Sequence, residues 1–355
     1  MASATSAPST SSSTTTTLQQ RLAAAAPKLL QNGWAVIDDA LPSSTFQLLR
    51  EQMASLHAVG GLRQHRFGFK ASESAKPELY TKPNIFEAEL DDAPVAAAAP
   101  KLKQTLQTID LQSAARAAFP SLELLSGADA AAIKLQCNEG GGGSFPHHYD
   151  NAGPPSKRRL TCLFYLNPQW KDGDGGELLL SPWLQPPIRI APSHGRLVLF
   201  LSDTVLHRVL PSRAAIRYCF TIWLDGASTN GPAALRLDAR KPCDEALSLD
   251  PAQRLLSRAV YSEEYAESIR DCFATTPGQR DAVLAAHERH VASMMANAAF
   301  ARLATHAREL KQSVGKEEVI VPPPPQELPM MGIELRIRAL CVDRVQCRTT
   351  VVTVT

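Results

Sequence analysis

The chain has 355 residues, 44% of them hydrophobic, which is enough for one sizeable core plus an accessory part. Its 37 basic and 35 acidic residues give a formal net charge of +2, so the overall charge favours neither a nucleic-acid-binding protein nor one that binds anionic membranes. No uninterrupted apolar run is long enough to span a bilayer.

The seven cysteines are scattered and form no CxxC pair or zinc-finger spacing. We therefore expect an intracellular, reducing compartment, the cytoplasm or the nucleus. Residues 1–17 contain 12 Ser or Thr and no hydrophobic periodicity, which predicts a disordered tail. Because no acidic residue precedes Asp38, a chloroplast or other organellar targeting signal is the alternative to a plain flexible tail.

The first predicted elements form a helix, a strand and a second helix. They cover residues 18–30, 33–39 and 45–57. Residues 63–95 show no clear period and predict an irregular segment, either a loop that covers a substrate or a plain solvated loop. A helix over 97–119 and a strand over 130–137 follow.

The stretch from Phe145 to Trp223 carries the candidate chemistry. His148 and Asp150 are two residues apart in a segment predicted to be extended, so both side chains point to one face and can bind one ion. His147 points away by the same alternation. His207, from a distant strand, would complete a set of two imidazoles and one carboxylate. Such a set leaves coordination positions open, as is typical of non-haem Fe(II) oxygenases.

Two predicted strands alternate in a way that indicates a barrel with a functional inner face. We expect Leu210–Arg213 to form a turn that brings Arg217 back toward His207. In the strand that follows, one face is mixed and the other wholly apolar. The mixed face holds Arg217, Cys219, Thr221 and Trp223, and the apolar face holds Tyr218, Phe220, Ile222 and Leu224. Residues 159–166 alternate likewise, with Thr161, Leu163 and Tyr165 on the face opposite Leu160, Cys162, Phe164 and Leu166.

The chain resembles the Fe(II)/2-oxoglutarate-dependent dioxygenases, in the prolyl-4-hydroxylase-like branch that includes the hypoxia-factor prolyl hydroxylases. The resemblance extends from about Gly33 to Gly226. It is most specific over His148-x-Asp150, Leu163–Asn167, Gly175–Leu178, Gly195–Phe200, His207 and Arg217-Tyr218. The resemblance implies a double-stranded β-helix, or jelly-roll, core.

The resemblance also implies roles for individual residues. His148, Asp150 and His207 would bind iron, Arg217 would hold the distal carboxylate of 2-oxoglutarate, and Tyr165 would donate its hydroxyl to that carboxylate. The reaction it implies consumes O2 and 2-oxoglutarate and hydroxylates a C–H bond, with ascorbate as an expected further cofactor.

The region after Leu224 predicts helices. Their expected ranges are 251–260, one from about Glu263, and 277–311. The fold class is thus mainly β with flanking helices and a C-terminal helical extension. The predicted domain organisation is a tail over 1–17, an oxygenase domain over 18–226, a helical extension over 245–312, and a Pro-rich tail over 313–355.

The leading functional hypothesis is a dioxygenase that hydroxylates a peptidyl-proline or another protein side chain. One alternative is an oxygenase acting on a small metabolite, since fold and cofactor motifs do not specify the substrate. A second is a jelly-roll module that binds metal but serves only in interaction or sensing. The sequence leaves the oligomeric state open.

Overall fold

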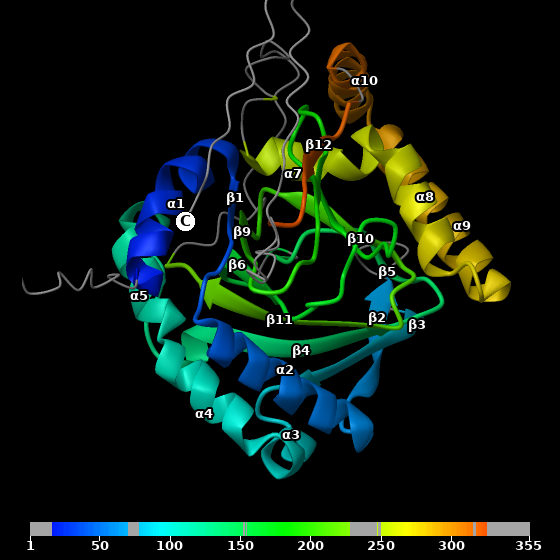
Figure 1. Cartoon of the computed structure of the whole chain (residues 1–355). Coiled ribbons are helices and arrows are strands. Elements are labelled where there is room, and N and C mark those ends of the chain that lie inside the picture. The colour runs from blue at the N-terminus through cyan, green and yellow to red at the C-terminus, as the bar shows by residue number, and fades with distance from the viewer. Residues whose placement is uncertain are drawn as a thin grey trace, which may run out of the picture. The chain divides into compact units, whose positions relative to one another are not determined.

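Two facing β-sheets form the centre of the protein (Figure 1). The computed structural model describes residues 16–69, 78–151, 153, 155–227, 247, 250–314 and 317–324. The seven-stranded sheet has the order β1 (Trp34–Ile37), β9 (Leu197–Leu201), β6 (Arg158–Tyr165), β11 (Ile216–Asp225), β4 (Ala131–Glu139), β3 (Glu78–Glu89) and β2 (Arg63–Phe69). The five-stranded sheet has the order β12 (Val319–Val321), β8 (Ile188–Ile190), β7 (Leu178–Ser181), β10 (Leu206–Ser212) and β5 (Gly143–His148).

Neighbouring strands are antiparallel, except for β12, which pairs parallel to β8. The predicted mainly β, jelly-roll-like core with flanking helices is therefore confirmed. The two sheets enclose an apolar core that takes residues from both, such as Phe200 from β9 and Leu180 from β7. This stacking places the inner faces of the two sheets opposite each other.

The alternation predicted for β6 and β11 divides their side chains between two environments. On β11 the apolar face packs into the core under the N-terminal helices, and the mixed face lines a cavity between the sheets. On β6, Leu160 and Phe164 pack in the core beneath the N-terminal helices, while Leu163 packs in the core between the two sheets. Period-two alternation thus correctly identified which residues face the site.

Helices in the N-terminal half cover the outer face of the seven-stranded sheet (Figure 1). They are α1 (Leu18–Asn32), α2 (Ser43–Ala58), α3 (Ala93–Ala98), α4 (Pro100–Ile109) and α5 (Leu111–Ala118), followed by short 3-10 turns over Pro120–Leu122 and Ala128–Ala130. Helix α1 ends at Gly33, whose φ of 78° requires the left-handed conformation that glycine adopts readily. The predicted helix-strand-helix opening is confirmed.

Helices follow β11 in sequence, as predicted, and four of them lie among the described residues. They are α7 (Asp250–Val260), α8 (Ser262–Cys272), α9 (Pro277–Met295) and α10 (Ala298–Ser313). Helix α8 packs directly on β5. A separate apolar cluster, built around Phe67, Tyr80 and Phe273, joins α8 and α9 to the β2–β3 hairpin. The C-terminal helices are therefore packed against the strands that surround the inner cavity.

The prediction that residues 63–95 are irregular is wrong, because most of this segment forms the antiparallel pair β2 and β3. Strand β3 also pairs with β4, with Ile85 opposite Asn138. The sequence of β2 is rich in polar residues and gave no strand signal. Partners from β4 and from the C-terminal helices stabilise this hairpin, so tertiary context overrides the weak local propensity.

Three element boundaries also differ from the prediction. The helix expected over 97–119 is interrupted at Ala99, just before Pro100, and at Asp110, whose φ is 44°. The helix expected over 277–311 is two helices, because Asn297 caps α10 by accepting a hydrogen bond from the backbone N–H of Phe300 (3.0 Å). The turn expected at Leu210–Arg213 lies at residues 213–215, and β10 and β11 enter different sheets.

Strand β12 was not predicted. Arg196 fixes its end by donating hydrogen bonds to the carbonyls of Val321 (3.3 Å) and Pro322 (2.7 Å), while Asp38 pairs with the same guanidinium. The predicted tail over 1–17 lies outside the described residues except for 16 and 17. Of the predicted C-terminal tail, residues 315, 316 and 325–355 lie outside them.

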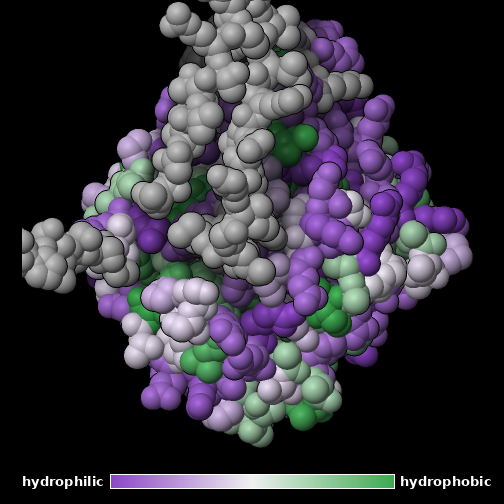
Figure 2. All heavy atoms as spheres, in the orientation of Figure 1, coloured by the Kyte–Doolittle hydropathy of each residue, from purple (hydrophilic) through white to green (hydrophobic). Residues whose placement is uncertain are grey.

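The surface is mainly hydrophilic on the face that Figure 2 shows, where apolar residues form separate spots. Among the described residues, the large apolar side chains that are exposed are Leu30, Val59, Leu79, Leu255, Val319 and Ile320. Among the described helices, none has the length and the apolar composition needed to cross a membrane.

Candidate active site

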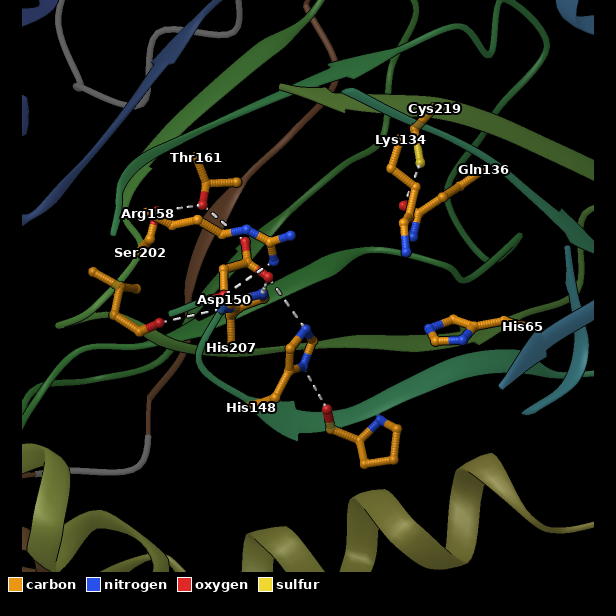
Figure 3. Close-up of polar contacts among 12 residues, drawn as sticks. His65, Lys134, Gln136, His148, Asp150, Arg158, Thr161, Ser202, His207 and Cys219 are labelled. Carbon is orange, nitrogen blue, oxygen red and sulfur yellow. Dashed lines mark hydrogen bonds and ion pairs between the residues drawn. The ribbon is translucent and has the colours of Figure 1, made fainter. Parts of the chain in front are cut away.

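The fold brings His148, Asp150 and His207 together at one end of the inner cavity (Figure 3). His148 ends β5, and His207 is its direct Cα partner on the adjacent strand β10. Oδ1 of Asp150 lies 3.5 Å from Nε2 of His148 and 3.6 Å from Nε2 of His207. The three side chains thus converge as the sequence predicted, in an arrangement suited to one divalent metal ion.

Hydrogen bonds set both imidazoles in the orientation that a metal ligand needs. Nδ1 of His148 donates to the carbonyl of Pro146 (2.8 Å), and Nδ1 of His207 donates to the carbonyl of Val205 (3.2 Å). The proton therefore sits on Nδ1, and the Nε2 lone pair of each ring faces Asp150. Burial lowers the pKa of His207 to about 4, which keeps its ring neutral and ready to bind a cation.

The carboxylate of Asp150 is held by hydroxyl groups on its other side. Its Oδ2 accepts a hydrogen bond from Thr161 (2.8 Å), whose hydroxyl is also 2.8 Å from that of Ser202. Burial alone would raise the pKa of Asp150, but interactions with His207 and His148 lower it well below its usual range. Asp150 is therefore an anion at neutral pH, with Oδ1 directed at the two histidines.

His147 points away from this group, as predicted. Its ring nitrogens lie 3.2 Å from the carbonyl of Glu264 on α8 and 3.3 Å from the hydroxyl of Ser181 on β7. It is fully enclosed by those elements, and burial lowers its pKa well below the usual value. His147 thus connects β5 to α8 and takes no part in the His148 group.

Arg217 lies on the mixed face of β11 and lines the same cavity. Its side chain is only 1% exposed. Nε donates to the carbonyl of Gly176 (2.8 Å) and Nη1 lies 3.5 Å from Sγ of Cys219, but Nη2 has no hydrogen-bond partner among the described residues. Its guanidinium carbon lies 5.0 Å from the ring centre of Tyr165, whose buried hydroxyl also lacks a described partner.

Nη2 of Arg217 and the hydroxyl of Tyr165, which have no hydrogen-bond partner among the described residues, could both bind a carboxylate ligand. A buried guanidinium without a counter-charge is unfavourable, and so is a buried hydroxyl without a hydrogen bond. An anion that accepts from both Nη2 of Arg217 and the hydroxyl of Tyr165 would satisfy them together. The residues present thus fit a carboxylate co-substrate next to the metal-binding group.

Gly176 determines where the Arg217 side chain can lie. A Cβ at this position would come within 2.8 Å of Cδ of Arg217, and the φ of Gly176 is 75°. We expect Gly176→Ala to displace the guanidinium and raise the Kd of 2-oxoglutarate roughly tenfold, the loss of about one charge-assisted hydrogen bond. Gly173→Ala is the matched control, because Gly173 has a φ of 91° with nothing within 4 Å of the added Cβ.

Both glycine variants should lose about 1 to 2 kcal/mol of stability from the left-handed backbone. Denaturant unfolding and 2-oxoglutarate titration separate the two effects. An equal change in Kd for both variants would show that the Gly176 contact does not position Arg217.

The cavity between the sheets has a volume of about 470 Å³, within the range of small-molecule sites. Part of its wall is absent from the predicted set of site residues. That part comprises His65, Lys82 and Lys134 from β2, β3 and β4, and Arg258, Tyr265, Ile269 and Val283 from the C-terminal helices. These residues form no motif, and a correct assignment of β2 and β3 as strands would have been needed to find the first two.

Comparisons with known proteins point to one superfamily. The model of the 2OG-Fe(II) oxygenase superfamily matches residues 133–225. The solved structure of a prolyl 4-hydroxylase from Phytophthora capsici is 37% identical, with a TM-score of 0.69, and the match covers 83% of this chain and 94% of that one. The human proteins Egl nine homolog 1 and prolyl hydroxylase EGLN3 are 26% identical over 230 residues and 34% identical over 102 residues.

The human matches are partial. They cover 61% and 28% of this chain, and the chain spans 52% and 42% of the length of those two relatives. The match to the Phytophthora capsici structure extends over nearly all of that protein, so it carries the assignment of family.

Proposed function

Because this chain belongs to the 2OG-Fe(II) oxygenase superfamily, in its prolyl-4-hydroxylase-like branch, we propose that it is a 2-oxoglutarate-dependent dioxygenase that hydroxylates a peptidyl-proline or another protein side chain. The observation that carries the proposal is the meeting of two sets of residues in one cavity. The metal-binding candidates are His148, Asp150 and His207. The carboxylate-binding candidates are Arg217, which lines the cavity with them, and Tyr165, whose ring centre lies 5.0 Å from the guanidinium carbon of Arg217.

In this proposal His148, Asp150 and His207 hold Fe(II) through two neutral imidazoles and one carboxylate, and Arg217 and Tyr165 bind the distal carboxylate of 2-oxoglutarate. When bound, Fe(II) and 2-oxoglutarate would activate O2. One oxygen atom would enter succinate as CO2 leaves, and the other would enter the C–H bond of the substrate. Thr161 orients Asp150, and the carbonyls of Pro146 and Val205 orient the two rings.

Two aromatic rings lie next to the metal-binding group. Phe145 stacks next to His148, with 6.2 Å between ring centres, and Phe200 lies 4.5 Å from the ring centre of His207. These apolar rings pack against both imidazoles, while the side chain of His148 remains 38% exposed. We propose ascorbate as the reductant that keeps the iron ferrous between turnovers.

The test is succinate formation by the full chain supplied with Fe(II), ascorbate, O2 and 2-oxoglutarate, with and without proline-containing peptides. Succinate should form, and a peptide that is hydroxylated should increase its rate and gain one oxygen atom in its mass spectrum. His148→Ala is the control and should form no succinate. Wild-type protein that binds Fe(II) and 2-oxoglutarate but never produces succinate would instead indicate a non-catalytic metal-binding module.

A further inference from the structure

The cavity wall opposite the metal-binding group is basic. Figure 3 shows His65, Lys134 and Gln136 across the cavity from His148, Asp150 and His207. Only one Asp or Glu lines the cavity among the described residues, and it is Asp150. The Lys and Arg residues that line it are Lys82, Lys134, Arg158, Arg217 and Arg258.

Interactions within the protein account for three of these cations. Lys134 pairs with Glu87 (3.1 Å) and Glu89 (3.3 Å) on β3. Arg158 stacks on Trp223 at 3.9 Å, and its Nη1 donates to the carbonyl of Asp150 (3.2 Å).

The third cation with a partner in the protein is Arg258, whose guanidinium carbon lies 4.8 Å from the ring centre of Tyr265. The fourth cation, Arg217, is assigned to 2-oxoglutarate. The formal charges of Fe(II), Arg217, Asp150 and the 2-oxoglutarate dianion cancel, so the loaded catalytic group adds no net negative charge for the fifth cation, Lys82. Glu87, which pairs with Lys134, lies 3.8 Å from Nε2 of His65, so its carboxylate is near Lys82 but outside ion-pair distance of its Nζ.

Lys82 is in an unusual position for a lysine. It is 7% exposed, and no described carboxylate lies within ion-pair distance of its Nζ. Its one hydrogen bond among the described residues goes to Nε2 of His65 (3.3 Å). Nδ1 of His65 lies 3.0 Å from the carbonyl of Arg66 and donates to it, so Nε2 is the acceptor for Lys82. An ammonium group has three N–H donors, so two remain for a ligand.

Two aromatic rings lie against the Lys82 ammonium group. Nζ of Lys82 lies 3.9 Å from the ring centre of Phe145 and 5.2 Å from that of Phe67. Phe145 in turn stacks next to His148, so Lys82 is connected to the metal-binding group through a single aromatic ring. Burial lowers the pKa of Lys82 to about 8, and the group is still mostly protonated at pH 7.

We infer that Lys82 binds an anionic group of the substrate, specifically a carboxylate, and thereby places the C–H bond to be hydroxylated near the metal. His65 acts as a positioning residue that holds the ammonium in the cavity. This inference rests on the proposed function and narrows its substrate to molecules with a carboxylate near the reacting carbon. That carboxylate comes from an acidic side chain, a peptide C-terminus or a free amino acid.

Matched pairs of compounds that differ only in this group distinguish the three sources. The pairs are a proline peptide with Glu or Gln beside the proline, a peptide ending in proline with a free or amidated C-terminus, and free L-proline or prolinamide. Binding is measured by calorimetry under anaerobic conditions on the full chain loaded with Fe(II) and 2-oxoglutarate, where no turnover occurs. In at least one pair, the carboxylate compound should bind roughly 10- to 100-fold more tightly than the amide.

Substitution of Lys82 tests whether this residue causes the preference. Lys82→Met keeps the length and apolar contacts of the stem, and we expect the carboxylate-to-amide ratio to fall to about one. Lys82→Arg should retain most of the preference. Lys103→Met, at an exposed lysine paired with Asp91, is the control and should behave as wild type. The Kd of 2-oxoglutarate should stay unchanged in all three variants.

Two results would overturn the inference: wild-type protein that binds both members of every pair equally, or Lys82→Met that keeps the preference. A rise in the Kd of 2-oxoglutarate in Lys82→Met would also contradict it, because Lys82 would then bind the co-substrate. If Lys82→Met does not fold, the same comparison is made with Lys82→Gln. Failure of the proposed function gives a different result: the wild-type protein would form no succinate, whichever of these compounds it binds.

Discussion

Replacing Arg217 by methionine should weaken the binding of 2-oxoglutarate by roughly 10- to 100-fold, because a charge-assisted hydrogen bond to a buried guanidinium contributes roughly 1.5 to 3 kcal/mol. Metal binding should be nearly unchanged, since the hydrogen bonds of Arg217 go to Gly176 and Cys219 and not to the three candidate ligands. The measurement is titration of the anaerobic Fe(II) protein with 2-oxoglutarate, followed by the visible absorption of the complex.

Two further variants make this test specific. Tyr165→Phe removes one hydroxyl and keeps the ring next to Arg217, so it should raise the Kd less, by about tenfold or below. Arg213→Met removes a neighbouring exposed arginine at the end of β10 and should leave the Kd unaltered. If Arg217→Met leaves the Kd of 2-oxoglutarate unchanged, or if Arg213→Met raises it by the same factor, Arg217 does not bind the co-substrate.

Removing any one of the three candidate metal ligands should abolish stoichiometric Fe(II) binding. We expect His148→Ala, Asp150→Ala and His207→Ala each to lose more than roughly 100-fold in metal affinity, since even residues that only support a ligand contribute about 10- to 100-fold. Asp150→Ala also removes the only anionic ligand of the set. Anaerobic metal titration of the purified variants gives the result directly.

His147→Ala is the matched control for the metal ligands. This residue is adjacent to His148 but hydrogen-bonds toward α8 and β7, so the variant should bind one Fe(II) per chain. It should be less stable by about 1 to 3 kcal/mol, because buried partners lose their hydrogen bonds. Thermal unfolding of the metal-free proteins measures that loss. A variant at His147 that loses the metal, while His148→Ala keeps it, would show that the register of β5 is shifted by one residue.

The graded variant Thr161→Val tests the support of Asp150. It removes the hydroxyl that donates to Oδ2 and keeps a β-branched side chain of similar size in the middle of β6. Metal affinity should fall by roughly 10- to 100-fold and remain measurable. Loss as complete as in Asp150→Ala would mean that Thr161 does more than orient the carboxylate.

The sequence by itself determined the residues on the inner faces of β6 and β11 and the local pairing of His148 with Asp150. It succeeded there because these features follow from short-range geometry. Side chains alternate along a strand, and two residues separated by one position share a face whatever the rest of the fold does. The motifs around His207 and Arg217 then supplied the family, which fixed the expected roles of residues far apart in the chain.

Only the tertiary structure decided what lies opposite the metal-binding group. Lys82 and His65 come from a hairpin with no clear strand pattern. Its conformation depends on pairing with β4 and on packing against Phe273, which directly follows α8. The sequence likewise could not predict that Nη2 of Arg217 has no hydrogen-bond partner among the described residues, because this depends on the groups that the fold places around it. Contacts between distant segments set the burial and charge of these groups, and these in turn determine what the cavity binds.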